Sequence, residues 1–178
     1  AIKKLTSGKI AISAPDAGSG RNSAVFKWPS RSGRVSILNE NIFLNANTST
    51  TLINIQNIKN TATIRGSVPY GRFGTAIEFL NNLLVVGAAF QDTDTLSFNG
   101  REMGKVFAFN KVLNTSVTAN VAAAWSFVGK RSGARCGSSI AILNDSIHGI
   151  RFAIGSPLAE INNKERVGVV DVLQIKLN

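Results

Sequence analysis

The sequence contains few of the residues from which catalytic and metal centres are usually built. Its 178 residues include one cysteine and one histidine. A single cysteine excludes an internal disulfide, and a zinc site normally draws on several His or Cys ligands. The histidine, His148, lies in a predicted loop, whereas a catalytic triad needs a packed and oriented imidazole. We therefore expect a protein that is not an enzyme and that carries no metal or other cofactor.

Long apolar runs are also missing. The longest, around Leu83–Phe90, is too short to span a bilayer and has the length of a β-strand. No P-loop and no Gly-rich dinucleotide fingerprint occurs, because the glycines separate apolar runs instead of clustering. These absences favour a protein with no membrane span and no nucleotide site.

Acidic residues are scarce: 10 Asp+Glu stand against 20 Lys+Arg, which gives a net charge of +10 and a pI of about 10.4. Such a balance favours acidic partners. The basic residues come singly or in pairs, as at Lys3–Lys4 and Lys130–Arg131, so a generally basic surface and a dedicated anion site are both open. The aromatic residues alternate into predicted strands and form no stacking platform, so nucleic acid would bind only through non-specific charge.

An internal repeat organises most of the chain. Ala62–Gly74 aligns with Trp125–Gly137 at a constant offset, since 129 − 66 = 63 for one glycine pair and 137 − 74 = 63 for another. An apolar run follows each segment, and then a second run ends in small residues, as LLVVGAA and RFAIGSP. A third run follows, as GKVFAF and GVVDVL. Self-similarity at such a period is typical of repeat architectures.

The N-terminal part carries a shortened version of the same pattern. Lys9–Pro15 reads KIAISAP, like the second run, and Ser23–Trp28 reads SAVFKW, like the third. Extra residues separate Trp28 from Thr61, with loop composition around a possible extra strand at Val35–Leu38.

The matched runs have the chemistry of β-strands. They are short, rich in Val, Ile, Phe and Ala, and bounded by Gly, Pro, Asn or Ser. The sequence offers no convincing amphipathic helix, because Val121–Trp125 is too short. About four strands in each repeat of 60-odd residues is typical of a propeller blade, so we predict an all-β fold.

The motifs resemble those of the FG-GAP family, the blades of the integrin-α propeller. Phe73-Gly74 matches the FG and Gly87-Ala88-Ala89 the GAP, with alanine in the proline place. Cys136-Gly137 and Gly155-Ser156-Pro157 form the next pair. The residue patterns GRFGTAIEFL and GARCGSSIAIL most resemble those of the C-terminal propeller of glycosylphosphatidylinositol-specific phospholipase D. The resemblance covers nearly the whole chain except about Pro29–Lys59.

The resemblance implies a partial β-propeller of about two and a half four-stranded blades. Residues 1–61 form a partial first blade with an inserted Asn/Thr/Ser-rich segment, 62–124 the second blade, and 125–178 an incomplete third. The first blade is expected to lack its FG strand and the last to lack its fourth strand. Because so few blades cannot close a ring and leave unpaired edges, we expect a larger propeller, completed by a longer polypeptide or by other chains.

Calcium is the ligand that the family resemblance suggests. Calcium-binding FG-GAP blades carry a D-x-[DN]-x-D-G loop between the FG and GAP strands, because the cation needs several oxygen ligands. That place holds only Asn81-Asn82 in the middle blade, and Asn144–Gly149 in the last blade has one carboxylate. We therefore expect no calcium site. Cys136 replaces the Phe of FG as a smaller apolar filler, and a reactive thiol is the alternative.

One face of the predicted propeller collects charged loops. In an up-down blade, the second-to-third and blade-to-blade connections emerge on the same face, called here the loop face. Its connections are Asp16–Asn22, Gly66–Arg72, Phe90–Met103, Gly129–Arg135 and Leu158–Val167. Loops on a rigid scaffold often carry function, although ordinary solvated loops are the alternative. The residues predicted to bind a partner there are Arg72, Asp92, Asp94, Arg101, Lys130, Arg131, Arg135, Lys164 and Arg166.

These observations predict a non-catalytic module for protein interaction or scaffolding, integrin-α-like and located outside the cell or at its surface, as in cell adhesion. Its partner would be a protein, or other chains that complete the propeller. Two alternatives stay open. One is an accessory propeller of a phospholipase D-like enzyme. The other, which the high pI supports, is a basic structural subunit of a large complex, including an organellar (mitochondrial) one.

Overall fold

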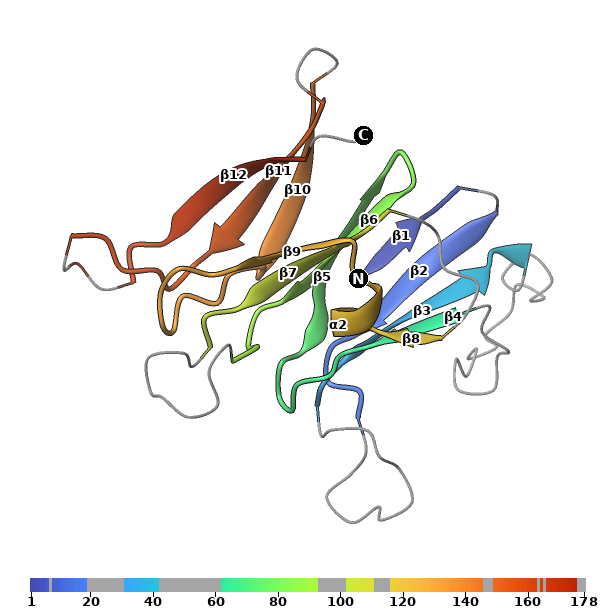
Figure 1. Ribbon diagram of the computed structural model, residues 1–178, viewed down its shortest axis with the longest axis horizontal. Helices are drawn as coiled ribbons and strands as arrows, with labels where there is room; N and C mark the ends of the chain where they lie inside the picture. Colours follow the sequence, from blue (N-terminus) through green and yellow to red (C-terminus); the bar gives the residue numbers. More distant parts are fainter. Residues whose placement is uncertain are drawn as a thin grey trace, which may run out of the picture.

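The computed structural model describes residues 1–6, 8–18, 31–41, 62–92, 102–110, 116–145, 149–162, 164 and 166–175. Over these residues the chain is all-β, and its strands form three sheets that lie side by side (Figure 1). The predicted all-β fold class is confirmed. Two of the apolar runs predicted as strands, at Thr75–Leu80 and Arg151–Ile154, lie within strands.

The first sheet has the order β1-β2-β3-β4-β8. Its strands are β1 (Ile2–Lys4), β2 (Lys9–Ala14), β3 (Arg34–Asn39), β4 (Ala62–Arg65) and β8 (Val117–Thr118). The first four run antiparallel in chain order, and β8 adds in parallel beside β4. The short β1 occupies the place in which the first blade was expected to lack a strand.

The second sheet has the order β5-β6-β7-β9, with all neighbours antiparallel. Its strands are β5 (Phe73–Leu80), β6 (Leu83–Ala88), β7 (Lys105–Phe109) and β9 (Trp125–Val128). A single helical turn, α2 (Ala119–Ala122), precedes β9.

The third sheet has the order β10-β11-β12, again antiparallel. Its strands are β10 (Ser139–Asp145), β11 (Gly149–Ser156) and β12 (Val169–Ile175). Each sheet is therefore a meander, in which consecutive strands are hydrogen-bonded neighbours, and β8 is the one addition.

The sheets divide the chain one strand later than the repeat boundaries at 62 and 125 predicted. β4 pairs with β3 and closes the first sheet, and β9 pairs with β7 and closes the second. A glycine follows each of these strands, Gly66 after β4 and Gly129 after β9, and the chain passes there into the next sheet. The aligned segments begin before these glycines, so each one contains the last strand of the preceding sheet.

The third strand of the first sheet is also displaced from its predicted place. Ser23–Trp28 lies outside the described residues, and β3 pairs with β2 as β7 pairs with β6. The run after Gly33, RVSIL, corresponds to the run after Gly104, KVFAF. Val35–Leu38 is therefore a regular member of its sheet and not an extra strand.

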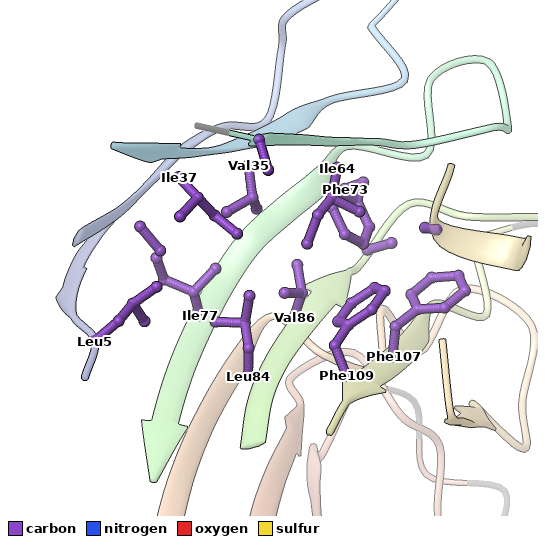
Figure 2. Packing of buried hydrophobic residues seen from close by; sticks show 14 residues of the cluster. Leu5, Val35, Ile37, Ile64, Phe73, Ile77, Leu84, Val86, Phe107 and Phe109 are labelled. Carbon is purple, nitrogen blue, oxygen red and sulfur yellow. The ribbon is translucent and has the colours of Figure 1, made fainter. Parts of the chain in front are cut away.

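Two apolar cores fill the spaces between neighbouring sheets. The core between the first and second sheets includes Ile37, Ile64 and Phe73 (Figure 2). The Phe73 ring meets Phe107 and Phe109 edge-on, at centroid distances of 5.6 and 6.3 Å. The second core, between the second and third sheets, includes Leu83, Val85, Val106, Cys136, Phe152 and Ile154.

The first and second sheets meet at a junction of close backbone contacts. Phe73 N donates to Ser32 O at 2.9 Å, and Gly66 N donates to Gly33 O at 2.9 Å. Gly33 has a φ of 83°, and a Cβ there would overlap the carbonyl oxygen of Phe73. Position 33 therefore requires glycine, for its conformation and for its lack of a side chain.

The second and third sheets meet in the same way. Cys136 N donates to Met103 O at 2.9 Å, and Gly129 N donates to Gly104 O at 2.9 Å. Gly104 has a φ of 78°, and its Cβ would overlap the carbonyl oxygen of Cys136. The sequence repeat thus corresponds to equivalent contacts in space, with Cys136 in the place of Phe73.

Candidate functional site

Two arginines lie at equivalent points of the two junctions, directly before Phe73 and Cys136, and the N–H of each donates to a carbonyl oxygen of the preceding sheet's connection, that of Arg31 and that of Glu102. Arg72 and Arg135 have left-handed φ angles of 52° and 57°. The Thr75 hydroxyl donates to the Arg72 carbonyl at 2.6 Å, and the Ser138 hydroxyl donates to the Arg135 carbonyl at 2.7 Å. The repeat therefore fixes the backbone from which both guanidinium groups project.

Both guanidinium groups pack against one aromatic ring. The Cζ atoms of Arg72 and Arg135 each lie 4.4 Å from the centroid of Phe90. A cation over a ring at this distance contributes about 0.5–1 kcal/mol at an exposed site. Phe90 follows β6, and its N–H donates to Gly71 O at 3.3 Å. One ring thus connects the arginines of the two junctions.

Carboxylates orient the two arginines. Arg72 Nε lies 3.0 Å from Asp16 Oδ1, and Arg135 Nη2 lies 2.8 Å from Glu102 Oε2. Arg135 Nε also donates to that Glu102 oxygen at 2.8 Å, while Asp92 Oδ1 accepts the Glu102 N–H at 2.7 Å. The pairs are partly exposed, so each contributes at most about 1 kcal/mol. Their main effect is to hold the guanidinium groups in place.

A depression of about 700 Å³ lies over this cluster. Arg31 is exposed in it and makes no ion pair with any residue that the structure describes. Tyr70 is 53% exposed. Arginine and tyrosine are the residue types most often found at the centres of protein–protein interfaces. The residues that line the depression are Arg31, Tyr70, Arg72, Phe90, Asp92, Glu102, Ser132 and Gly133.

The structure brings some of the predicted site residues together. Arg72, Asp92 and Arg135 lie in the cluster around Phe90. Asp94 and Arg101 lie outside the described residues, so the structure does not place them.

The remaining predicted residues lie away from the depression. Lys130 is directed toward the third sheet, where its Nζ lies 3.6 Å from Asp171 Oδ1. Arg131 is exposed in the connection that also supplies Ser132 to the depression. Lys164 and Arg166 are exposed between β11 and β12. The described residues that were predicted to bind a partner therefore divide into one cluster around Phe90 and several cations outside it.

Sequence reasoning did not select Arg31, Tyr70 or Phe90 as site residues. Phe90 gave a signal, because it is a large apolar residue in a connection of polar and small residues. Arg31 gave none, because its place in the depression depends on the pairing of β3 with β2. Tyr70, with its left-handed φ of 60°, corresponds to Gly133 in the next junction, with a φ of 71°.

The single thiol is buried. Burial raises the pKa of Cys136 to about 11, and a hydrogen bond with Ser156 opposes the shift. Since the thiolate is the nucleophile, little of it is present near neutral pH. The geometry supports Cys136 as an apolar filler of the second junction and disfavours the reactive-thiol alternative.

The loops considered for calcium have structural roles where they are described. Asn81 and Asn82 have φ angles of 49° and 65° and close the two-residue turn between β5 and β6. Asn144 and Asp145 belong to the ladder between β10 and β11, while residues 146–148 lie outside the described part. Among the described residues, no group of three or more His, Cys, Asp or Glu side chains could hold a metal ion.

Comparison of the sequence with models of known protein families and with curated proteins returns no match. Within the described ranges, no helix is long and apolar enough to cross a membrane.

Proposed function

We propose that this chain is a non-catalytic, FG-GAP-type segment of a β-propeller that binds a protein partner through its loop face. The observation that carries the proposal is the cluster of Arg72, Phe90 and Arg135, which spans both sheet junctions and contributes Arg72 and Phe90 to the lining of the depression. A binding site that bridges two junctions is held by the backbone of all three sheets. Such preorganisation lowers the entropic cost of binding.

The propeller part of the proposal is supported by the equivalence of the two junctions. The glycines at 33 and 104, the residues at 73 and 136, and the arginines at 72 and 135 make matching contacts. Sheets that stack by a repeated junction are the physical basis of a radial architecture. The location outside the cell or at its surface follows from the family resemblance alone.

The chemistry of the depression favours an acidic segment as the ligand. Arg31 offers an exposed guanidinium without a described carboxylate partner, and Arg72 and Arg135 keep part of their surface exposed. Tyr70 adds exposed aromatic surface beside them. Guanidinium groups bind carboxylates through charge-assisted hydrogen bonds, so a Glu- or Asp-rich stretch of a partner protein fits this surface.

The test uses a fluorescein-labelled peptide of alternating Glu and Ser residues, with binding followed by anisotropy at physiological salt. Since a hydrogen bond to a charged group contributes about 1.5–3 kcal/mol, Arg31→Glu should weaken binding by about tenfold or more. Lys4→Glu is the matched control, because it makes the same charge change on the exposed first hairpin, where Lys4 pairs with Glu40. Equal losses in the two variants would contradict the proposal.

A polyanion comparison separates this function from the basic-subunit alternative. Heparin and single-stranded RNA are titrated over a range of salt concentrations. Tighter binding to either polyanion than to the peptide, with a steep salt dependence and no effect of Arg31→Glu, would favour non-specific charge. Peptide binding that depends on Arg31 and only moderately on salt would support a defined site.

A further inference from the structure

The third sheet presents the face that is covered in the other two sheets. We infer that this face is a prepared junction, which binds a further β-sheet blade of the same kind. The inference rests on the propeller architecture proposed above and adds the residues of the contact and the chemistry of the partner. The outer face of the third sheet is defined here by Leu143, Ala153, Gly155, Val170 and Val172.

In the first two sheets, a valine of the third strand packs against the sheet that follows. Val35 in β3 and Val106 in β7 are completely buried, and their Cγ2 atoms would lie 3.5 and 3.0 Å from a Cβ on Gly74 and Gly137. These glycines belong to the first strand, or the turn before it, of the sheet that follows. A branched apolar side chain on one sheet thus packs against a glycine of the next.

The equivalent residue in the third sheet is Val170. It pairs with Gly155 as Val106 pairs with Gly87, yet it is 66% exposed. Two residues further along, Ile37 and Ala108 are buried, whereas Val172 is 56% exposed. Exposed branched residues on a sheet face usually mark an interaction surface.

The third sheet also has a glycine in the conformation that is found at the two complete junctions. Gly33, Gly104 and Gly168 each precede the third strand of their sheet and have φ angles of 83°, 78° and 75°. A Cβ at Gly33 or Gly104 would overlap backbone atoms of the following sheet, whereas at Gly168 the nearest atom is Pro157 O, at 3.3 Å. The backbone therefore adopts the junction conformation where the described residues supply no following strand.

A cavity lies at this position. It has a volume of about 530 Å³, and Gly155, Pro157, Gly168 and Val170 are among its lining residues. At the two complete junctions the corresponding space is occupied by Phe73 and Cys136, each followed by a glycine with positive φ. The fitting partner is therefore a blade whose first strand carries a bulky apolar residue followed by glycine.

A second copy of this chain does not offer that partner. The apolar–glycine pairs at 73–74 and 136–137 are themselves buried in complete junctions. The first strand of the chain, Ile2–Lys4, contains no glycine. The contact consequently requires a blade that residues 1–178 do not supply.

The test titrates a synthetic peptide of residues 71–89, which carries Phe73-Gly74 and the β5–β6 hairpin, into the isotopically labelled intact chain. Amide shifts are expected at Gly155, Gly168 and Val170 and not around Phe90. Val170→Lys and Gly168→Ala should each weaken binding by about tenfold or more, because they put a charge or a Cβ into the contact. A control peptide with Gly74→Val has the same charge and should not bind, because valine disfavours the φ of 97° found there.

Gly133→Ala is the matched protein control. Gly133 has a φ of 71°, like Gly168, but no atom lies within 4 Å of its added Cβ. Both substitutions introduce the same backbone strain, so only contact with the peptide separates them. Equal affinity of the two variants, or no shift on the outer face up to about 1 mM peptide, would overturn the inference.

If the free hairpin peptide is poorly soluble, the same contact can be tested with the hairpin attached to the protein. The same hairpin is joined to the C-terminus by a flexible Gly/Ser linker, which raises its effective concentration. The urea midpoint should then rise in the Gly133→Ala background and not in the Gly168→Ala background. A rise in both or in neither would contradict the proposed contact.

Self-association and the proposed function are separated by two further readouts. Dimers of the chain alone in sedimentation velocity, lost in Val170→Lys, would assign the face to a second copy and refute the partner blade. If the acidic peptide still binds through Arg31 while the hairpin does not bind, this inference fails and the loop-face function stands. If only the hairpin binds, the reverse holds.

Discussion

Alanine substitutions at Gly104 and Gly168 should lower the free energy of unfolding by different amounts, although the two glycines have nearly the same backbone conformation. Their φ angles are 78° and 75°. A left-handed conformation costs a residue with a Cβ about 1–2 kcal/mol, and this cost is common to both variants. The difference between the variants therefore measures what surrounds the added methyl group.

At Gly104 the methyl group enters the second junction. It would lie 2.5 Å from Cys136 N and would overlap the Cys136 carbonyl oxygen. The sheets must separate, which costs about 1–3 kcal/mol as overpacking. Loss of the hydrogen bonds from Cys136 N and Gly129 N adds about 0.5–1.5 kcal/mol each. Together with the backbone cost, Gly104→Ala should lower the free energy of unfolding by roughly 3–8 kcal/mol.

At Gly168 the nearest atom, Pro157 O, is 3.3 Å away, so only a small adjustment is added to the backbone cost. Gly168→Ala should lose about 1–2 kcal/mol. Urea unfolding followed by circular dichroism measures both free energies, with m-values compared to check that the denatured states match. Gly133→Ala, with the same strain and open space, should resemble Gly168→Ala. Equal destabilisation at 104 and 168 would refute the account of the junction.

Three further predictions concern single side chains. Phe73→Ala should lower the free energy of unfolding by about 3–5 kcal/mol in urea titrations, because it empties a fully buried site, and a loss below about 1 kcal/mol would contradict its place in the core. Since burial raises the pKa of Cys136 from 9.0 to about 11, the unfolded chain releases this proton first. The thiol's contribution to stability is therefore complete below pH 9 and is lost toward pH 11, so the urea midpoint should fall over that range more steeply than in Cys136→Ala; parallel profiles would exclude the effect. Phe90→Leu should lower the free energy of unfolding by about 1–2 kcal/mol, because two partly exposed cation–ring contacts are lost. The same substitution should weaken binding of the acidic peptide, and an unchanged peptide affinity would show that Phe90 is not part of the site.

Short strands in a repeated order can be predicted for this protein from its amino-acid sequence. Apolar runs bounded by glycine and proline specify strands locally, and a constant offset between Gly66 and Gly129 shows that the same local solution is used twice. The matched pairs at 73–74 and 136–137 lie at the two junctions, and their glycines have positive φ, a conformation that glycine adopts without steric cost.

The division of the strands among sheets, and the choice of side chains that meet at the site, depend on contacts between segments far apart in the sequence. β4 and β9 close the sheets that precede them, because strand pairing depends on hydrogen-bond partners far along the chain. Arg31, Phe90 and Arg135 are separated in sequence and meet only because two junctions place their connections on one face. The exposure of Val170, against the burial of Val35 and Val106, depends on whether a neighbouring sheet covers it. Burial is a property of what lies on the other side of a residue, and local sequence pattern carries no record of that.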